Sequence, residues 1–457
     1  MQTQHSVSIL LLGAGEPADY LSALPPSPVR INRPPLPVRS LFWPERSQDR
    51  LHELLQKPEQ ALQLRCLRSA ALLPSDLLLP RLSKLQLLPG SDLQQLPRLL
   101  RSDLWPSLCR LTVHQLKAEL WDALPASLER LSCHLVSLGS LAKPSISHLH
   151  LHANFALTEA QHRLPALVPN LEILSLAAKR SVLNAPGLIN LGALPHLATL
   201  RLHFSLKPGG GLWSQPLPAL RNLYVIGSAP ALSLAQLAPN LRQLHLHLYV
   251  LSARFWDGLP GGLELLSLRL TCRDQPPLEA SRSLPHLRRL CIQNQPIALP
   301  RLAELAPNLE SLDLPARAPL HPPPSLRRLR IRFHASSKAE ALPDLAQLLA
   351  ALPDLRCLVL RPWSKQMGGL PWPPALAQLS LELSVELDWS FLAELLQPPR
   401  RLPFKLLCRS LAPPTTAKQL FAFLPDNALL RIHSAALFPA SRFGDLNPCC
   451  YIFLEKN

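Results

Sequence analysis

The chain has 457 residues, with 47 Lys and Arg against 31 Asp and Glu, which gives a formal net charge of +16. About a quarter of the residues are Leu, 51 are Pro, and aromatic residues make up only 5%. This composition excludes a core built on large rings and predicts one built on Leu. The basic balance favours an acidic partner, such as an acidic protein, nucleic acid or an anionic membrane surface.

Nine cysteines are spread along the chain without a C-x-x-C pair. The odd number and the spacing argue against a secreted disulfide framework and against a thiolate zinc site. The apolar run at residues 7–13 is short for a signal peptide and has no basic region before it. No stretch reaches the roughly 18 apolar residues of a membrane span. We therefore expect a cytoplasmic protein without a membrane span.

Residues 1–60 do not follow the repeat described below, although V-R-S-L-F-W at 38–43 resembles a degenerate copy. We expect an N-terminal cap that covers the first open edge of a repeat array. The run L-L-L-G-A-G at 10–15 is a poor match to a dinucleotide-binding loop, because the third Gly is missing and Pro17 follows. We therefore expect no cofactor.

A frame of the form L-x-x-L-x-L recurs through residues 61–385. One clear copy is P-N-L-E-S-L-D-L at 307–314, and others lie at 169–176 and 239–246. The spacing between copies, 17 to 29 residues, clusters in the range of leucine-rich repeats, roughly 20–29 residues. The first apolar residue of the frame stands at positions 82, 108, 128, 146, 171, 197, 220, 241, 263, 287, 309, 326, 355 and 376.

Each copy of the frame predicts one short strand. The last two apolar residues are two apart, so they share one face of a strand, and the preceding Pro suits a strand start. Between strands, Leu234–Leu237 and Leu302–Leu305 have apolar residues at i and i+3 and are predicted to form helical turns. Stacked strands lie about 4.8 Å apart and packed helices about 8–10 Å. We therefore expect an α/β solenoid, a curved horseshoe with parallel strands on the concave face and short helices or loops on the convex face.

Over roughly residues 60–385 the chain resembles the leucine-rich-repeat family. The A-P-N-L-x-x-L-x-L units are similar to the ribonuclease-inhibitor-like and F-box-associated types, and the L-P-x-S-L units to the short bacterial-effector type. The resemblance implies a curved protein-binding scaffold. It leaves a substrate-recognition adaptor of a ubiquitin ligase as an alternative, although residues 1–60 contain no convincing F-box helix pattern.

The chain departs from the family at one position. Many members carry Asn three residues after the last apolar strand residue, where its side chain ties one repeat to the next. Here that position holds Asn only at Asn154. Ser or Thr stands there at Ser205, Ser228, Thr271 and Ser384.

Residues 386–457 contain L-P-F at 402–404 and N-A-L at 427–429, spaced like decaying repeats, and we expect a C-terminal cap. The segment is too short for the separate catalytic domain that follows the repeats of bacterial leucine-rich-repeat ubiquitin ligases. Cys449 and Cys450 have no nearby His or acidic pattern that would activate a nucleophile. We therefore expect that the protein is not an enzyme.

The candidate site is the face formed by the residues that flank the last two apolar positions of each frame, because these point away from the core. Half of the 16 His lie at such positions, and the only acidic residues there are Asp313 and Glu382. We expect this basic face to bind an acidic protein partner, with the chain acting as a monomer. The proposed partner-binding residues are Arg110, Arg130, His134, His148, His150, His152, Arg201, His203, His245, His247, Arg269, Arg289, Arg328, Arg330 and Arg332.

The pattern allows two other interpretations. A basic stripe is also typical of nucleic-acid binding, but Tyr224 is the only aromatic residue at these positions to stack on a base. His148, His150 and His152 lie on one strand face, about 6.6 Å apart, and two imidazoles at that separation could share a zinc ion. No Cys or carboxylate joins them at the outward positions, so we expect solvated histidines and no metal.

Overall fold

The computed structural model describes residues 7–9, 38–43, 66–69, 79–87, 96–101, 105–135, 137–153, 163–178, 191–203, 215–226, 234–248, 251, 255–272, 282–294, 301–315, 322–332, 342–363, 373–383, 405–410, 428–434 and 450–456. The chain divides into two compact units, unit 1 (residues 1–226) and unit 2 (residues 227–457). Each unit is described by itself.

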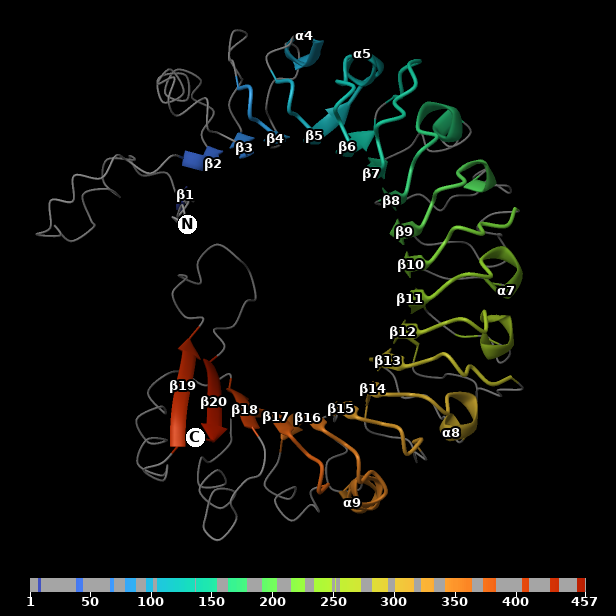
Figure 1. Ribbon diagram of the computed structural model, residues 1–457, viewed down its shortest axis with the longest axis vertical. Coiled ribbons are helices and arrows are strands. Elements are labelled where there is room, and N and C mark those ends of the chain that lie inside the picture. Colours follow the sequence, from blue (N-terminus) through green and yellow to red (C-terminus); the bar gives the residue numbers. More distant parts are fainter. Residues whose placement is uncertain are drawn as a thin grey trace, which may run out of the picture. The chain divides into compact units, whose positions relative to one another are not determined.

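Unit 1 is a stack of parallel strands, each paired with the next one along the chain. The strands lie on the inner side of the unit and its helices on the outer side (Figure 1). The helical elements include α4 (Leu96–Arg101), α5 (Ala118–Asp122) and the 3-10 turn η1 (Leu191–Ala193), and residues 163–167 are helical as well. The strands are β1 (Val7–Ile9), β2 (Val38–Trp43), β3 (Cys66–Ser69), β4 (Lys84–Leu87), β5 (Arg110–Leu116), β6 (Arg130–Leu135), β7 (His148–Ala153), β8 (Ile173–Ala178), β9 (Thr199–His203) and β10 (Asn222–Ile226).

Unit 2 continues the pattern from β11 to β18, again with parallel neighbours in chain order. Its last strand β20 then pairs antiparallel with both β18 and β19, which ends the parallel stacking. The helical elements are η2 (Phe255–Gly258), α7 (Leu234–Leu237), α8 (Leu302–Leu305) and α9 (Leu342–Ala350). The strands are β11 (Gln243–Leu248), β12 (Leu265–Leu270), β13 (Arg289–Gln293), β14 (Ser311–Pro315), β15 (Arg328–Arg332), β16 (Cys357–Trp363), β17 (Gln378–Leu383), β18 (Lys405–Ser410), β19 (Ala428–Ser434) and β20 (Cys450–Lys456).

The fold class expected from the repeat is confirmed. Each of the fourteen copies of the frame provides one strand, from β4 to β17. The helical turns α7 and α8 have the predicted bounds. Within each unit the strands line the inner side and the short helices the outer side (Figure 1). In the described residues no helix is long and apolar enough to cross a membrane.

A β-turn precedes every strand from β4 to β17. At all fourteen positions, the N–H of the first apolar residue donates to the carbonyl oxygen three residues earlier, as from Leu309 to Ala306 at 3.2 Å. Pro occupies the second position of twelve of these turns. Its fixed φ suits that position of a type I or II turn. The turn thus explains why Pro stands two residues before the first Leu in most copies of the frame. This reason is more specific than the start of a strand.

The core is built from the apolar positions of the frame. In β14 and the turn before it, Leu309, Leu312 and Leu314 are 0%, 0% and 4% exposed, while Ser311 and Asp313 on the other face are only half-buried. Burying one Leu side chain stabilises the fold by about 1.5–3 kcal/mol. Because these side chains pack against the same positions of the neighbouring repeats, the stability of the stack depends on contacts between neighbours.

Polar side chains in the turns tie neighbouring repeats together. In one case, Asn308 Nδ2 donates to the carbonyl oxygen of Pro285 in the preceding repeat, at 2.9 Å. The residue just before the first Leu of the frame makes a similar bond in other repeats, namely Asn170, Ser107, Ser127 and Ser325. These turn side chains therefore tie one repeat to the next, which is the role of the Asn after the strand in many leucine-rich-repeat proteins.

At the family position itself, Thr271 donates from Oγ1 to the carbonyl oxygen of Leu248, at 3.3 Å. The other candidates at that position, Asn154, Ser205, Ser228 and Ser384, lie outside the described residues.

Candidate functional site on the inner faces

The inner face of each unit consists of the strand side chains that point away from the Leu core. Parallel pairing in register sets these side chains in rows that cross the strands. In unit 1 the middle row contains His150, Ser175 and Arg201 on β7, β8 and β9. The next row contains His152 and His203, with Ala177 between them. The predicted site residues of unit 1 are thus brought onto one surface.

The unit 1 inner face carries positive charge without acidic residues. Lys84, Arg110 and Arg130 occupy the same row of three neighbouring strands, and all three are exposed. At the described outward positions of β4 to β10 there is no Asp or Glu. Adjacent strands are about 4.8 Å apart, so these cations are close neighbours with no acid between them.

Four histidines of the unit 1 inner face, His114, His134, His150 and His152, form a contiguous group. The ring centroids of His114 and His134 are 4.9 Å apart, and those of His134 and His152 are 4.8 Å apart and stacked. His150 meets His152 edge-on, with a hydrogen bond of 2.8 Å between the two Nε2 atoms. His148 Nδ1 lies 2.8 Å from the hydroxyl of Ser147. The sequence placed these histidines on one face but contained no signal for their direct contacts.

Burial keeps several of these histidines neutral near pH 7. Desolvation, followed by the neighbouring His152, lowers the pKa of His150 to about 4. Desolvation and then Arg201 lower the pKa of His203, and desolvation and then Arg130 lower that of His148. At neutral pH the positive charge of this face therefore comes from its Lys and Arg side chains, and these histidines contribute uncharged hydrogen-bonding groups.

On the unit 2 inner face, part of the expected positive charge is neutralised. Asp313 Oδ2 accepts hydrogen bonds from Arg332 Nη2 at 2.6 Å and from Arg330 Nη1 at 3.3 Å. Arg328 pairs with Ser311 in the register. Of the three arginines of β15, Arg328 is the one that is exposed.

The remaining predicted residues of unit 2 lie on its inner face as well. Arg269 and Arg289 are exposed, whereas His245 and His247 are half-buried. Desolvation, followed by Arg269, lowers the pKa of His247. The side chain of Glu382, the second acidic residue expected on this face, lies outside the described part of the chain.

The metal interpretation gains no support. In the part of the chain that the structure describes, no group of three or more His, Cys, Asp or Glu side chains could hold a metal ion. The short distance between His150 and His152 is that of a hydrogen bond.

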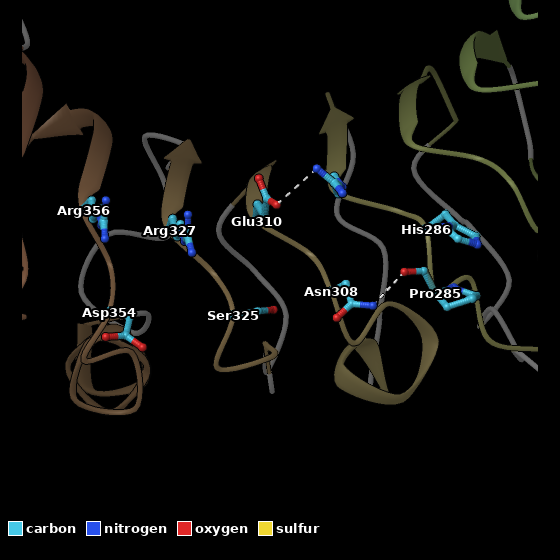
Figure 2. A pocket seen from close by; sticks show the side chains of 9 residues that line it. Pro285, His286, Asn308, Glu310, Ser325, Arg327, Asp354 and Arg356 are labelled. Carbon is cyan, nitrogen blue, oxygen red and sulfur yellow. Dashed lines mark hydrogen bonds and ion pairs between the residues drawn. The ribbon is translucent and has the colours of Figure 1, made fainter.

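A second polar feature, not predicted from the sequence, lies at the edge where the strands begin. We call it the rim row; it consists of the charged residues that directly follow the first Leu of the frame in unit 2, namely Arg242, Glu264, Arg288, Glu310, Arg327 and Arg356. Arg242 and Glu264 form an ion pair of 3.1 Å, and Arg288 and Glu310 one of 3.8 Å. The alternation of signs ends at Arg327 and Arg356, which lie side by side in Figure 2. The alternating charge at this frame position is visible in the sequence and would have predicted these ion pairs.

A cavity of about 600 Å³ opens at this rim. Two of its polar side chains already make other contacts: Asn308 bonds Pro285 (Figure 2), and Ser325 bonds Pro307. Glu310 and Asp354 also line it and oppose an anion. For these reasons the rim cavity is a weaker candidate for anion binding than the unit 1 inner face.

The frame, the turn before each strand and the parallel ladder together define the class of protein: a leucine-rich-repeat solenoid. No protein-family model matches the chain, and no curated protein matches it. Among solved structures, it is similar to a circular leucine-rich-repeat protein, CroV588, with 15% identity and a TM-score of 0.43 over 71% of this chain. It is also similar to YopM from Yersinia enterocolitica WA-314, with 20% identity and a TM-score of 0.33 over 71% of this chain and 75% of that one. The match spans about half, 54%, of the length of CroV588.

Proposed function

We propose that the protein is a non-catalytic scaffold that binds an acidic segment of a protein partner on its basic inner faces. The observation that carries this proposal is the row of Lys84, Arg110 and Arg130 on three neighbouring strands, with no acidic residue at the described outward positions of unit 1. Like charges in such a row repel one another, and carboxylates laid along it would relieve that repulsion. The planar guanidinium of Arg suits paired hydrogen bonds to a carboxylate.

A protein partner is favoured over nucleic acid by the lack of stacking surfaces. Binding of single strands depends on aromatic side chains that are free to stack on bases. Across β4 to β10, Tyr224 is the only Phe, Trp or Tyr at a described outward position. Its ring is already covered by Arg201, whose Cζ lies 5.0 Å from the ring centroid.

The cellular setting and the adaptor alternative depend on other features. We propose a cytoplasmic location, which the cysteine pattern favours. An adaptor of a ubiquitin ligase would need a docking element within residues 1–60, of which the structure describes only β1 and β2.

The test is the affinity of a fluorescent Glu-rich peptide, measured by anisotropy. The double variant Arg110→Glu and Arg130→Glu should bind at least about tenfold more weakly, because two charge contacts become repulsions. The matched control, Arg98→Glu with Arg221→Glu, makes the same change of net charge in unit 1 at exposed positions on α4 and before β10. Equal losses in both variants would contradict the proposal. So would tighter binding of a single-stranded oligonucleotide than of the peptide at the same salt concentration.

A further inference from the structure

The most unusual group on the unit 1 inner face is the hydroxyl of Ser175. Ser175 stands at an outward position of β8, yet it is only 4% exposed. Its Oγ is buried and has no hydrogen-bond partner. A buried polar atom without a partner costs stability, and such groups in folded proteins commonly mark a place where a ligand or water binds.

The neighbours of Ser175 explain how it is buried. In the register, His150 lies on one side of it and Arg201 on the other. Both are far larger than Ser, and they flank it in the row. Along β8 the next outward residue is Ala177, whose methyl group likewise lies between His152 and His203. Two small residues on one strand are thus bordered by four large nitrogen-bearing side chains.

We propose that Ser175, His150 and Arg201 form a subsite that holds one carboxylate group of an acidic partner. The proposal rests on the proposed function and names the chemistry recognised at one point of the face. Ser175 donates its O–H to a carboxylate oxygen, and Arg201 supplies N–H donors and the opposite charge. These are charge-assisted hydrogen bonds, which are stronger than those between neutral groups.

The titratable side chains at the outward positions of β6, β7 and β9 around this site are all His or Arg. On β7 the neighbours are His148 and His152, and on β9 there is His203. From β6, His134 stacks on His152 and Arg130 pairs with His148. No outward residue of β8 is ionisable, and Tyr224 on β10 lies beneath Arg201. Two acids, Glu172 and Glu129, act on the group through His148, whose pKa they raise against the larger effects of desolvation and Arg130.

A bound carboxylate would change the protonation of the site. In the free protein the pKa of His150 is lowered to about 4, so its imidazole is neutral at pH 7. A nearby anion stabilises the imidazolium and raises that pKa. Binding then takes up a proton, so the affinity for a carboxylate rises as the pH falls from 7 towards 5.

The same hydroxyl makes Ser175→Ala a discriminating variant. In the free protein the change removes a buried group that has no partner, so the variant should unfold at a slightly higher temperature. In the bound state it removes a hydrogen bond to a charged group, so acetate should bind about tenfold more weakly. Higher stability with weaker binding is a combination that a purely structural role of Ser175 would not produce.

The experiment titrates the full chain with sodium acetate and follows the histidine Cε1–H signals by NMR, with sodium chloride at equal ionic strength as the reference. We expect saturable shifts of His150 and His203 that are larger at pH 5.5 than at pH 7.5. Arg201→Gln should abolish them and Ser175→Ala should weaken them. The matched control is Ser132→Ala, because Ser132 lies on the opposite side of His150 in the same row and has Thr112 rather than an arginine beyond it.

Each outcome decides the matter. If chloride produces the same shifts, or if Ser132→Ala weakens acetate as much as Ser175→Ala, the subsite is refuted. If inorganic phosphate binds more than tenfold tighter than acetate at equal charge, the carboxylate assignment is overturned. Because acetate needs no partner protein, the subsite can fail while the Glu-rich peptide still binds, or succeed while the peptide does not.

Discussion

The Nε2 atoms of His150 and His152 lie 2.8 Å apart and share one hydrogen bond. Only one of the two nitrogens can carry a hydrogen in this geometry, because two N–H groups would otherwise point at each other. The contact is therefore compatible with two neutral rings or with one neutral and one protonated ring. It is lost when both rings are protonated.

This contact predicts acid sensitivity. The pKa of His150 is about 4 in the folded protein against 6.5 for an unperturbed imidazole. The unfolded chain therefore binds a proton first, and the stability that neutral His150 contributes is present above pH 6.5 and is lost as the pH falls from 6.5 towards 4. His148 and His203, with pKa values lowered in the same direction, add to this loss.

The measurement is the thermal midpoint of unfolding at pH 7 and pH 5. We expect a smaller decrease for His150→Asn than for the wild-type protein. His196→Asn changes an exposed histidine of a turn in the same unit and serves as the control. An unchanged decrease in His150→Asn would show that His150 does not titrate in this way.

The ties between turns predict a specific loss of stability. Asn170 donates to the carbonyl oxygen of Pro144, at 3.0 Å. Asn170→Ala should lower the free energy of unfolding by about 1 kcal/mol, the usual contribution of one hydrogen bond. His196 occupies the same turn position one repeat later and is exposed, so His196→Ala should change stability by less than about 0.5 kcal/mol. The free energies of unfolding of the two variants are compared by urea denaturation. Equal losses of stability would show that the Asn170 hydrogen bond does not stabilise the fold.

The carboxylate of Asp313 has opposite effects on stability and on binding. It is 14% exposed and pairs with two arginines. Asp313→Asn should destabilise the fold by about 1–2 kcal/mol, less than the loss of a fully buried pair. It should also strengthen binding of the Glu-rich peptide to unit 2, because Arg330 and Arg332 are released. A variant that binds the peptide less well than the wild-type protein would contradict a role for these arginines.

The two faces of a strand predict different responses to the same substitution. Leu244 on β11 is 0% exposed, whereas Leu265 on the neighbouring β12 points outward and is half-buried. Leu244→Ala should cost about 2–5 kcal/mol because it leaves a cavity, and Leu244→Asp should unfold the repeats around it. Leu265→Ala should cost clearly less. Similar losses at both positions would contradict the assignment of the two faces.

Much of the fold follows from the local sequence, because each repeat is a local unit. Pro and Leu at fixed spacing determine the turn, and two apolar residues at spacing two determine the buried face of the strand. That is why Leu309 and Leu312 could be placed in the core and Asp313 outside it. The ties between repeats were harder to predict, since an Asn in a turn, such as Asn308, reveals its partner only when the preceding repeat is placed beside it.

The sequence predicts which surface carries the candidate site, but not the contacts between the side chains on it. Outward positions of the frame located Arg110 and His150 on the inner face. Pairing between side chains depends on register and side-chain conformation, which a single sequence does not contain. For this reason the sequence alone did not predict that Asp313 neutralises Arg332, or that Ser175 is buried between two larger neighbours.

The most direct test of the central claim is to map where an acidic segment binds. A Glu-rich peptide carrying a photo-reactive group is cross-linked to the full chain at low salt, and the labelled residues are identified by mass spectrometry. We expect labelling on the inner-face strands β4 to β7, around Arg110 and Arg130, and its loss in the double variant Arg110→Glu and Arg130→Glu. Labelling that falls mainly on the outer helices α4 and α5, or that persists unchanged in the variant, would contradict it.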